Sequence, residues 1–146
     1  MSTFRFHHEW PLPAPATQVF AALADVERYA TWWPQVRSSA RIDSESGSTT
    51  IRSFLPYTLE LVLRREVEDQ GSGMLRVAVH GDLEGWCQWV VRETPGAGCV
   101  AEFDQEAAVT PPLLARTAAV TGPLLRANHA WMMRSGRAGL VEHLTG

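Results

Sequence analysis

Three polar side chains interrupt the apolar faces of predicted strands, and their types and positions make them the first candidates for chemistry. Alternation of apolar and polar residues places Arg65, Gln105 and His8 on faces that are otherwise apolar. A polar group buried without a hydrogen-bond partner costs about 1–3 kcal/mol. We therefore expect these groups to pair with one another, with a helix residue such as Asn128, with water or with a ligand. The alternative is that they are satisfied structural groups near strand ends.

The candidates for catalysis are Arg65, His8 and His129, although no motif assigns a reaction to them. An arginine can stabilise a developing oxyanion, and a histidine can move protons near neutral pH. His129 is either a base in a pocket or a hydrogen-bond partner of the first helices. Asp82 and Glu84, which lie between two glycines, are either an acid–base pair or a solvated loop.

The positions of the histidines in the sequence argue against a metal site. His7 and His8 are neighbours on a strand and point to opposite faces. His129 and His143 lie about 21 Å apart along a helix that rises 1.5 Å per residue. The sequence has no paired-cysteine metal motif, no phosphate-binding glycine loop, no dinucleotide fingerprint and no nucleophile elbow. We expect neither a metal nor a cofactor.

Six tryptophans are many for 146 residues. Tryptophan combines a wide apolar face with one N–H donor, which suits a pocket for ring-shaped ligands, although filling the core is the alternative. We expect Trp10 in the core, and Trp33 and Trp86 at the mouth of a pocket. The predicted ligand-binding residues are Trp33, Tyr57, Leu61, Leu63, Arg65, Val77, Trp86, Trp89, Phe103, Gln105, Asn128 and Met132.

Length and composition predict one domain over residues 1–146, with an ordinary globular balance of 45% hydrophobic and 20% charged residues. The formal charge of −3 and the scattered arginines argue against nucleic acid as a partner. No apolar run is long enough to insert into a membrane, and the N-terminus does not resemble a cleaved signal peptide. We expect a cytoplasmic protein.

The two cysteines, Cys87 and Cys99, are expected to be reduced. If the intervening turn centres on residues 95–97, Cys87 lies opposite a residue near Gln105 in the neighbouring strand, and Cys99 lies further along. A disulfide between them is therefore not expected.

Turn residues at close spacing predict antiparallel hairpins rather than parallel β-α-β units. A first strand over Phe4–Trp10 precedes a proline-led helix that ends near Asp25 and a short second helix that Pro34 stops. A long helix is expected after Pro112, with its main segment from Pro123. Between the helices we expect strands at Val36–Asp43, Thr49–Phe54, Leu59–Asp69, Met74–His80, Trp86–Glu93 and Cys99–Val109.

This order of elements resembles the START-like superfamily, also called SRPBCC or Bet v 1-like, and in particular its polyketide cyclase/dehydrase-like branch. The resemblance is carried by Pro15–Phe20, Asp25–Tyr29, Trp32–Pro34, Gly81–Trp86 and Asn128–Met133. It implies an α+β helix-grip fold, a curved antiparallel seven-stranded sheet around a long C-terminal helix, with two short helices after the first strand. It also implies a deep hydrophobic cavity. Members include polyketide cyclases, lipid carriers and plant-type ligand binders.

Three functions stay open at this point. The first is binding of a hydrophobic, ring-containing small molecule, such as a lipid or a polyketide-like compound. The second is a cofactor-independent cyclase or dehydrase, in which Arg65 stabilises an enolate oxygen and His8 or His129 moves protons. The third is a partner module of a lipid or quinone pathway that docks through its helix ends, although the sequence specifies no protein partner.

Overall fold

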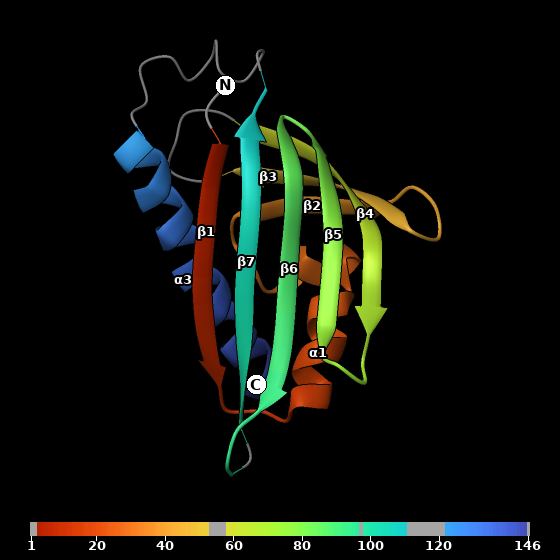
Figure 1. Ribbon diagram of the computed structural model, residues 1–146, viewed down its shortest axis with the longest axis vertical. Helices are drawn as coiled ribbons and strands as arrows, with labels where there is room; N and C mark the ends of the chain where they lie inside the picture. The colour runs from red at the N-terminus through yellow and green to blue at the C-terminus, as the bar shows by residue number, and fades with distance from the viewer. Residues whose placement is uncertain (1–2, 53–57, 97, 111–121, 146) are drawn as a thin grey trace.

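A seven-stranded antiparallel sheet curves around one long helix (Figure 1). The computed structural model describes residues 3–52, 58–96, 98–110 and 122–145. The strand order is β1-β7-β6-β5-β4-β3-β2. The strands are β1 (Thr3–Leu12), β2 (Val36–Arg41), β3 (Ser46–Arg52), β4 (Thr58–Asp69), β5 (Met74–Gly81), β6 (Leu83–Glu93) and β7 (Cys99–Val109).

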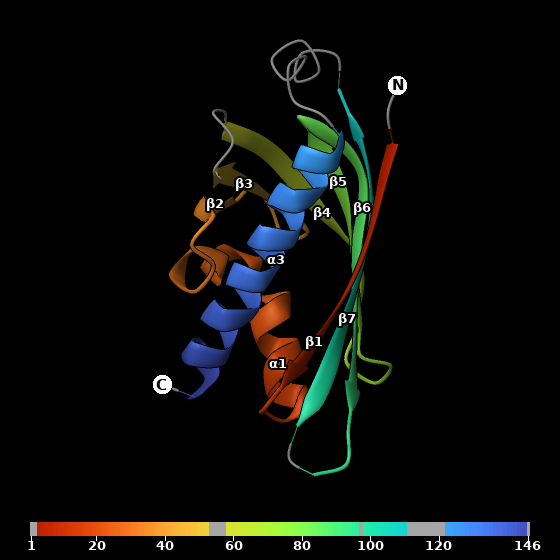
Figure 2. The same ribbon diagram turned by 90° about the vertical axis from the view of Figure 1, so that its left-hand side faces the viewer.

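Three helices complete the described part of the chain: α1 (Ala16–Ala24), the 3-10 helix η1 (Val26–Thr31) and α3 (Gly122–Thr145). Helices α1 and α3 lie on the same side of strands β5–β7, which we call the inner face of the sheet (Figure 2). The predicted α+β helix-grip architecture is confirmed. The predicted helical stretch over residues 113–121 lies outside the described residues.

Helix α1 forms where the sequence predicts it. The carbonyl oxygen of Pro15 accepts hydrogen bonds from the backbone N–H groups of Gln18 and Val19, so the proline-led turn opens the helix. Its apolar stripe of Val19, Phe20 and Leu23 is buried in the core.

The register between β6 and β7 confirms the prediction for the cysteines. Cys87 pairs with Gln105, and both cysteines are free thiols. Leu61, Val79 and Phe103, whose positions in the alternation predict an inward side chain, are buried. A period of two residues and a short hairpin turn are sufficient to fix this arrangement.

Strand β1 extends past its predicted end at Trp10, because it is an edge strand and tolerates proline. Pro11 pairs with Val100 of β7, and its carbonyl oxygen accepts hydrogen bonds from Arg137 of α3 at 2.7 and 3.0 Å. Arg126 of the same helix donates to the carbonyl oxygen of Arg5 at 3.2 Å. Two arginines of α3 therefore cover carbonyl groups along the edge of the sheet.

Strand β6 begins at Leu83 rather than at Trp86, so the predicted loop between Gly81 and Gly85 is wrong. Gly85 has φ +155°, and a Cβ added there would overlap the carbonyl oxygen of Glu106. Glycine at this position allows β7 to approach the backbone closely, which lets the strand continue instead of breaking.

Trp32 and Trp33 pack directly on two glycines of α3. A Cβ at Gly136 would overlap the Trp33 ring, and a Cβ at Gly139 would overlap the Trp32 carbonyl oxygen. The Trp33 Nε1–H also donates to the carbonyl oxygen of Met132 at 3.0 Å. We call this contact between Trp32–Trp33 and the glycines of α3 the tryptophan–glycine seam. It fixes the C-terminal half of α3 against the core.

We expect Gly139→Ala to lower the free energy of unfolding by about 1–3 kcal/mol, because the new methyl group displaces backbone that the core holds in place. Helix propensity alone predicts the opposite sign, a gain of about 1 kcal/mol. Chemical denaturation measures the difference. The control is Ala138→Gly at the exposed neighbouring residue, which reports helix propensity without any contact with the seam. A stabilised Gly139→Ala variant would contradict this packing.

Candidate functional site

A cavity of about 280 Å³ lies between the inner face of the sheet and α3. Leu63 and Val77 of the sheet face it and are only half-buried, because they border the cavity instead of other side chains. Trp89 and Phe103 form an aromatic part of its wall, with ring centroids 4.7 Å apart. Such a lining, mostly apolar with a few polar groups, is typical of small-molecule sites.

All but two of the predicted binding residues line this cavity. The exceptions are Tyr57, which lies outside the described residues, and Trp86. The residues in the wall are Trp33, Leu61, Leu63, Arg65, Val77, Trp89, Phe103, Gln105, Asn128 and Met132. That these residues contact a ligand stays a prediction.

The predicted position of Trp86 at the mouth of the cavity is wrong. Because Cys87 and Trp89 face inward, Trp86 lies on the outer face of β6. Its Nε1–H donates to Glu106 at 3.1 Å, and the guanidinium group of Arg76 lies 4.2 Å from its ring centre. This tryptophan therefore stabilises the outer surface of the sheet.

Arg65 lies at the cavity mouth and is exposed, not buried as the strand pattern predicts. The pairing of β4 with β5 shifts between Arg65 and Val67, which disturbs the alternation at this point. The side chain is 45% exposed, forms an ion pair with Glu68 at 3.2 Å and donates to the Ser44 carbonyl oxygen at 3.4 Å. Its charge therefore already has a partner.

Gln105 and His129 pair with each other across the space between β7 and α3. The Gln105 Oε1 and His129 Nε2 atoms are 2.8 Å apart. The imidazole stacks on the Phe6 ring, with centroids 3.7 Å apart, and its centre lies 5.3 Å from that of His8. Burial, with a smaller effect of His8, lowers the pKa of His129 to about 3. His129 is therefore neutral near pH 7 and a weak proton acceptor.

His8, the other candidate base, is half-buried beside Phe103 and does not line the cavity. Burial lowers its pKa as well. Neither histidine is therefore held in the charged form that would donate a proton to a substrate at neutral pH.

Two atoms of α3 at the cavity are buried and have no hydrogen-bond partner among the described residues. These are Asn128 Oδ1 and His129 Nδ1. The Asn128 side-chain amide donates to the Met132 sulfur at 3.6 Å, and the residue is only 8% exposed. We call Asn128 Oδ1 and His129 Nδ1 the acceptor pair. Sequence reasoning singled out both residues but could not show which atoms stay unpaired.

Tyr29 and Cys87 also line the cavity, and sequence reasoning missed them as site residues. The Tyr29 hydroxyl donates to the Leu23 carbonyl oxygen at 2.5 Å. Burial raises the pKa of Tyr29 above its usual value and raises the pKa of Cys87 to about 12. Both groups are therefore protonated near neutral pH. The strand pattern could have identified Cys87, because it lies two residues before Trp89 and therefore on the same, inward face of β6.

Carboxylates outnumber arginines at the cavity mouth, which the sequence did not suggest. The cavity wall includes the carboxylates of Asp25, Glu27, Asp43, Glu45 and Glu68, which we call the acidic rim, and the guanidinium groups of Arg41 and Arg65. Arg41 is itself paired with Glu27 at 2.5 Å. Among the described residues of the wall, no arginine is therefore without a carboxylate partner.

The predicted acid–base pair of Asp82 and Glu84 does not lie at the cavity. Asp82 Oδ2 accepts a hydrogen bond from the Glu60 backbone at 2.9 Å, and Glu84 pairs with His80 at 2.8 Å. These carboxylates therefore stabilise neighbouring backbone and side chains.

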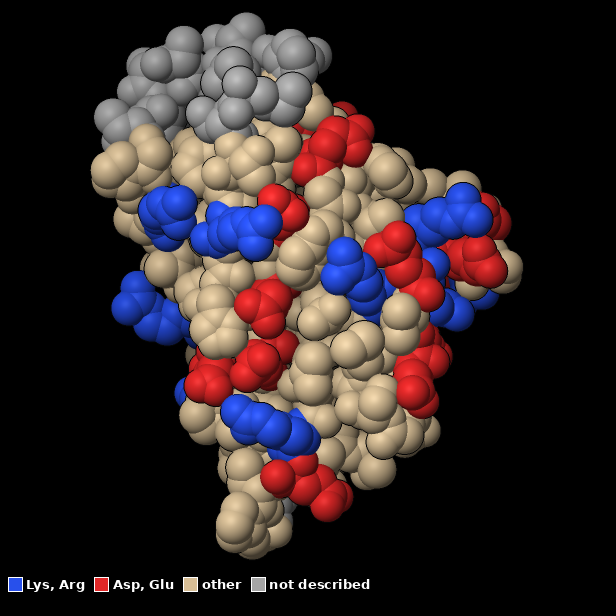
Figure 3. Space-filling model, viewed as in Figure 1, with Lys and Arg blue, Asp and Glu red and all other residues tan. Residues whose placement is uncertain are grey.

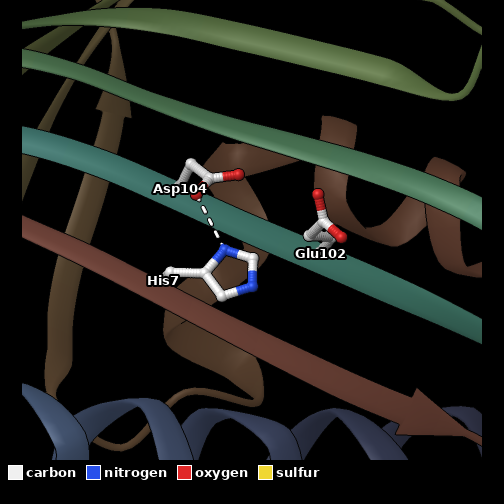
Figure 4. A group of neighbouring side chains, drawn as sticks. All are labelled: His7, Glu102 and Asp104. Atoms are coloured by element: carbon white, nitrogen blue, oxygen red, sulfur yellow. Dashed lines mark hydrogen bonds and ion pairs between the residues drawn. The ribbon is translucent and has the colours of Figure 1, made fainter.

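The outer face of the sheet carries charges of both signs over its strands (Figure 3). On it, His7, Glu102 and Asp104 hold potential metal-ligand atoms that all lie within 4.8 Å of one another (Figure 4). The spacing of histidines along one strand or helix does not reveal this group, because it joins β1 to β7. His7 is already hydrogen-bonded to Asp104 at 2.8 Å, and Glu102 lies 3.8 Å from Arg92. Ion pairs across the strands account for the cluster.

Comparisons with known proteins agree with the fold. The sequence model of the family described as "Polyketide cyclase / dehydrase and lipid transport" matches residues 12–142. No curated protein sequence matches the chain. None of the described helices is both long enough and apolar enough to cross a membrane.

Several solved structures are similar to this chain along nearly its whole length. A START superfamily protein from Mycobacterium smegmatis has a TM-score of 0.74 at 12% identity, with 96% of each chain covered. The Zhui aromatase/cyclase from a Streptomyces species has a TM-score of 0.73 at 15% identity, with 98% of this chain and 94% of that chain covered. A Thermus thermophilus protein has a TM-score of 0.74 at 17% identity, with 98% and 100% covered. These likenesses confirm the START-like fold.

We expect His129 to stay neutral as the pH falls from 6.5 to about 3, because burial holds its pKa near 3. In the unfolded chain the imidazole takes up a proton near pH 6.5. The contribution of this group to stability is therefore complete above pH 6.5 and is lost as the pH falls toward 3. NMR titration of the ring signals measures the pKa. His7 is the internal comparison, since its hydrogen bond to Asp104 raises its pKa above 6.5. A His129 that titrates together with His7 would contradict the buried placement.

Proposed function

We propose, from the premise that this chain belongs to the polyketide cyclase/dehydrase and lipid transport family, that its cavity binds a hydrophobic, ring-containing small molecule. The observation that carries the proposal is the apolar cavity of about 280 Å³ with Trp89 and Phe103 in its wall. Flat aromatic side chains offer a face on which a ring can stack.

The magnitude of apolar burial supports binding as a sufficient role. A ligand that buries about 300 Å² of apolar surface gains roughly 7 kcal/mol at about 25 cal/mol per Å². Association costs about 4 kcal/mol or more, so shape alone predicts weak affinity. Selectivity must therefore come from the polar groups of the cavity.

A cyclase or dehydrase is the second candidate, because the family description names these activities and a similar structure is called an aromatase/cyclase. The charged and titratable side chains weigh against it. Arg65 is paired with Glu68 at the mouth, and His129 is neutral and hydrogen-bonded to Gln105. Arg65 and His129 thus each already serve a structural contact, which favours binding.

We expect Val77→Trp to weaken binding of the neutral fluorescent probe N-phenyl-1-naphthylamine at least tenfold, because the larger side chain occupies cavity volume. Ala78→Trp is the matched control, since the next residue of β5 pairs with Trp86 and Arg64 on the outer face. Fluorescence titration gives both affinities, and thermal unfolding confirms that both variants fold. Equal affinities for the two variants, or no binding by the wild type, would contradict the proposal.

Arg65→Leu separates the two candidate functions. A binder should keep the affinity for N-phenyl-1-naphthylamine within about twofold, because the Arg65 head group lies at the mouth and is paired with Glu68. Neither the wild type nor this variant should form product from aromatic polyketide precursors, because a binder catalyses no reaction. Turnover by the wild type that disappears in Arg65→Leu, with probe binding retained, would establish the enzyme instead.

A further inference from the structure

The acceptor pair gives the proposed binding site a defined hydrogen-bond polarity. Because His129 Nε2 lies 2.8 Å from the carbonyl oxygen of the Gln105 side chain, Nε2 carries the ring proton. Nδ1 of the same ring then has only a lone pair. The side-chain nitrogen of Asn128 faces the Met132 sulfur, which leaves Asn128 Oδ1 as the unused group. Both unsatisfied atoms are therefore acceptors.

Buried acceptors without partners destabilise the protein, and a ligand that brings donors relieves this cost. Asn128 and His129 are consecutive residues of α3, and both line the cavity. A ligand without a donor leaves both atoms unpaired when it displaces water from them. The cavity should therefore distinguish two ligands of the same ring size by the presence of a donor.

The cavity wall offers an anionic ligand no unpaired cation among its described residues. The acidic rim holds five carboxylates, and both arginines of the wall are already paired with rim residues. Two further rim carboxylates, Asp25 and Glu45, are paired with Arg28 and Arg64, so the rim adds little net charge. His129 is neutral, so among the described lining residues no free cation remains to pair with a carboxylate ligand. A carboxylate would have to pass the rim and lose its hydration without compensation.

We propose that the ligand is a neutral ring compound with a hydroxyl or N–H donor, which Asn128 Oδ1 and His129 Nδ1 accept, and that carboxylates of the same ring size are rejected. This inference rests on the proposed function, because it assigns the ligand class of the same cavity. Asn128 and His129 are then residues that determine specificity, in addition to supporting the wall.

The test compares three probes that share a naphthalene ring, by isothermal titration calorimetry at pH 7. We expect 2-naphthol to bind about tenfold more tightly than 2-methoxynaphthalene, which corresponds to about 1.4 kcal/mol. 2-Naphthoate should bind most weakly. Equal affinities for all three probes would overturn the inference and leave the proposed function intact. No binding of any of them would overturn both.

Two variants assign the preference to the acceptor pair. In Asn128→Leu and in His129→Phe, the ratio between 2-naphthol and 2-methoxynaphthalene should fall by at least threefold, while 2-methoxynaphthalene itself still binds. That retained binding shows that the cavity is folded. Ser135→Ala, on the same helix and away from the cavity wall, should keep the wild-type ratio. A ratio unchanged in both acceptor variants would overturn the assignment.

Discussion

The structure depends first on the tryptophan–glycine seam between residues 32–33 and α3. Gly136 and Gly139 let the helix approach Trp33 and the Trp32 backbone so closely that no side chain fits between them. This contact fixes the C-terminal half of α3. Its N-terminal half, which carries Asn128, His129 and Met132, then passes over the cavity as part of the wall. Because Trp33 belongs to both the seam and the wall, stability and cavity shape are coupled.

The arginines of α3 complete this arrangement at the other side of the helix. Arg126 and Arg137 donate to carbonyl oxygens of β1, so the helix is tied to the edge of the sheet along its length. A helix held by backbone contacts on one side and by glycine packing on the other can leave a gap above the sheet without losing its position. The cavity is therefore a consequence of how α3 is anchored.

The fold and most of the cavity wall could be predicted because they depend on period and on turn length. Cys87 pairs with Gln105 as expected, since a strand with one buried face has only one register that keeps its apolar side inward. The sequence pattern places Trp86 wrongly because it predicts Gly85 within a loop, whereas Gly85 permits a close approach of β7 within a continuous strand. The strand pattern predicts a buried Arg65, but a register shift in the pairing of β4 with β5 brings it to the surface. The acidic rim joins residues from distant segments, and the acceptor pair is a property of individual atoms, so neither has a pattern in the sequence.

The proposed ring-containing ligand occupies the space between the inner face of the sheet and α3. The most direct test is the set of tryptophan indole N–H signals in ¹H–¹⁵N NMR spectra, recorded as 2-naphthol is added. Trp33 and Trp89 line the cavity, and Trp86 lies on the outer face with its N–H bonded to Glu106. We expect the signals of Trp33 and Trp89 to shift in a saturable manner while that of Trp86 stays in place. A saturable shift of Trp86 with no change at Trp33 and Trp89 would contradict this position of the ligand.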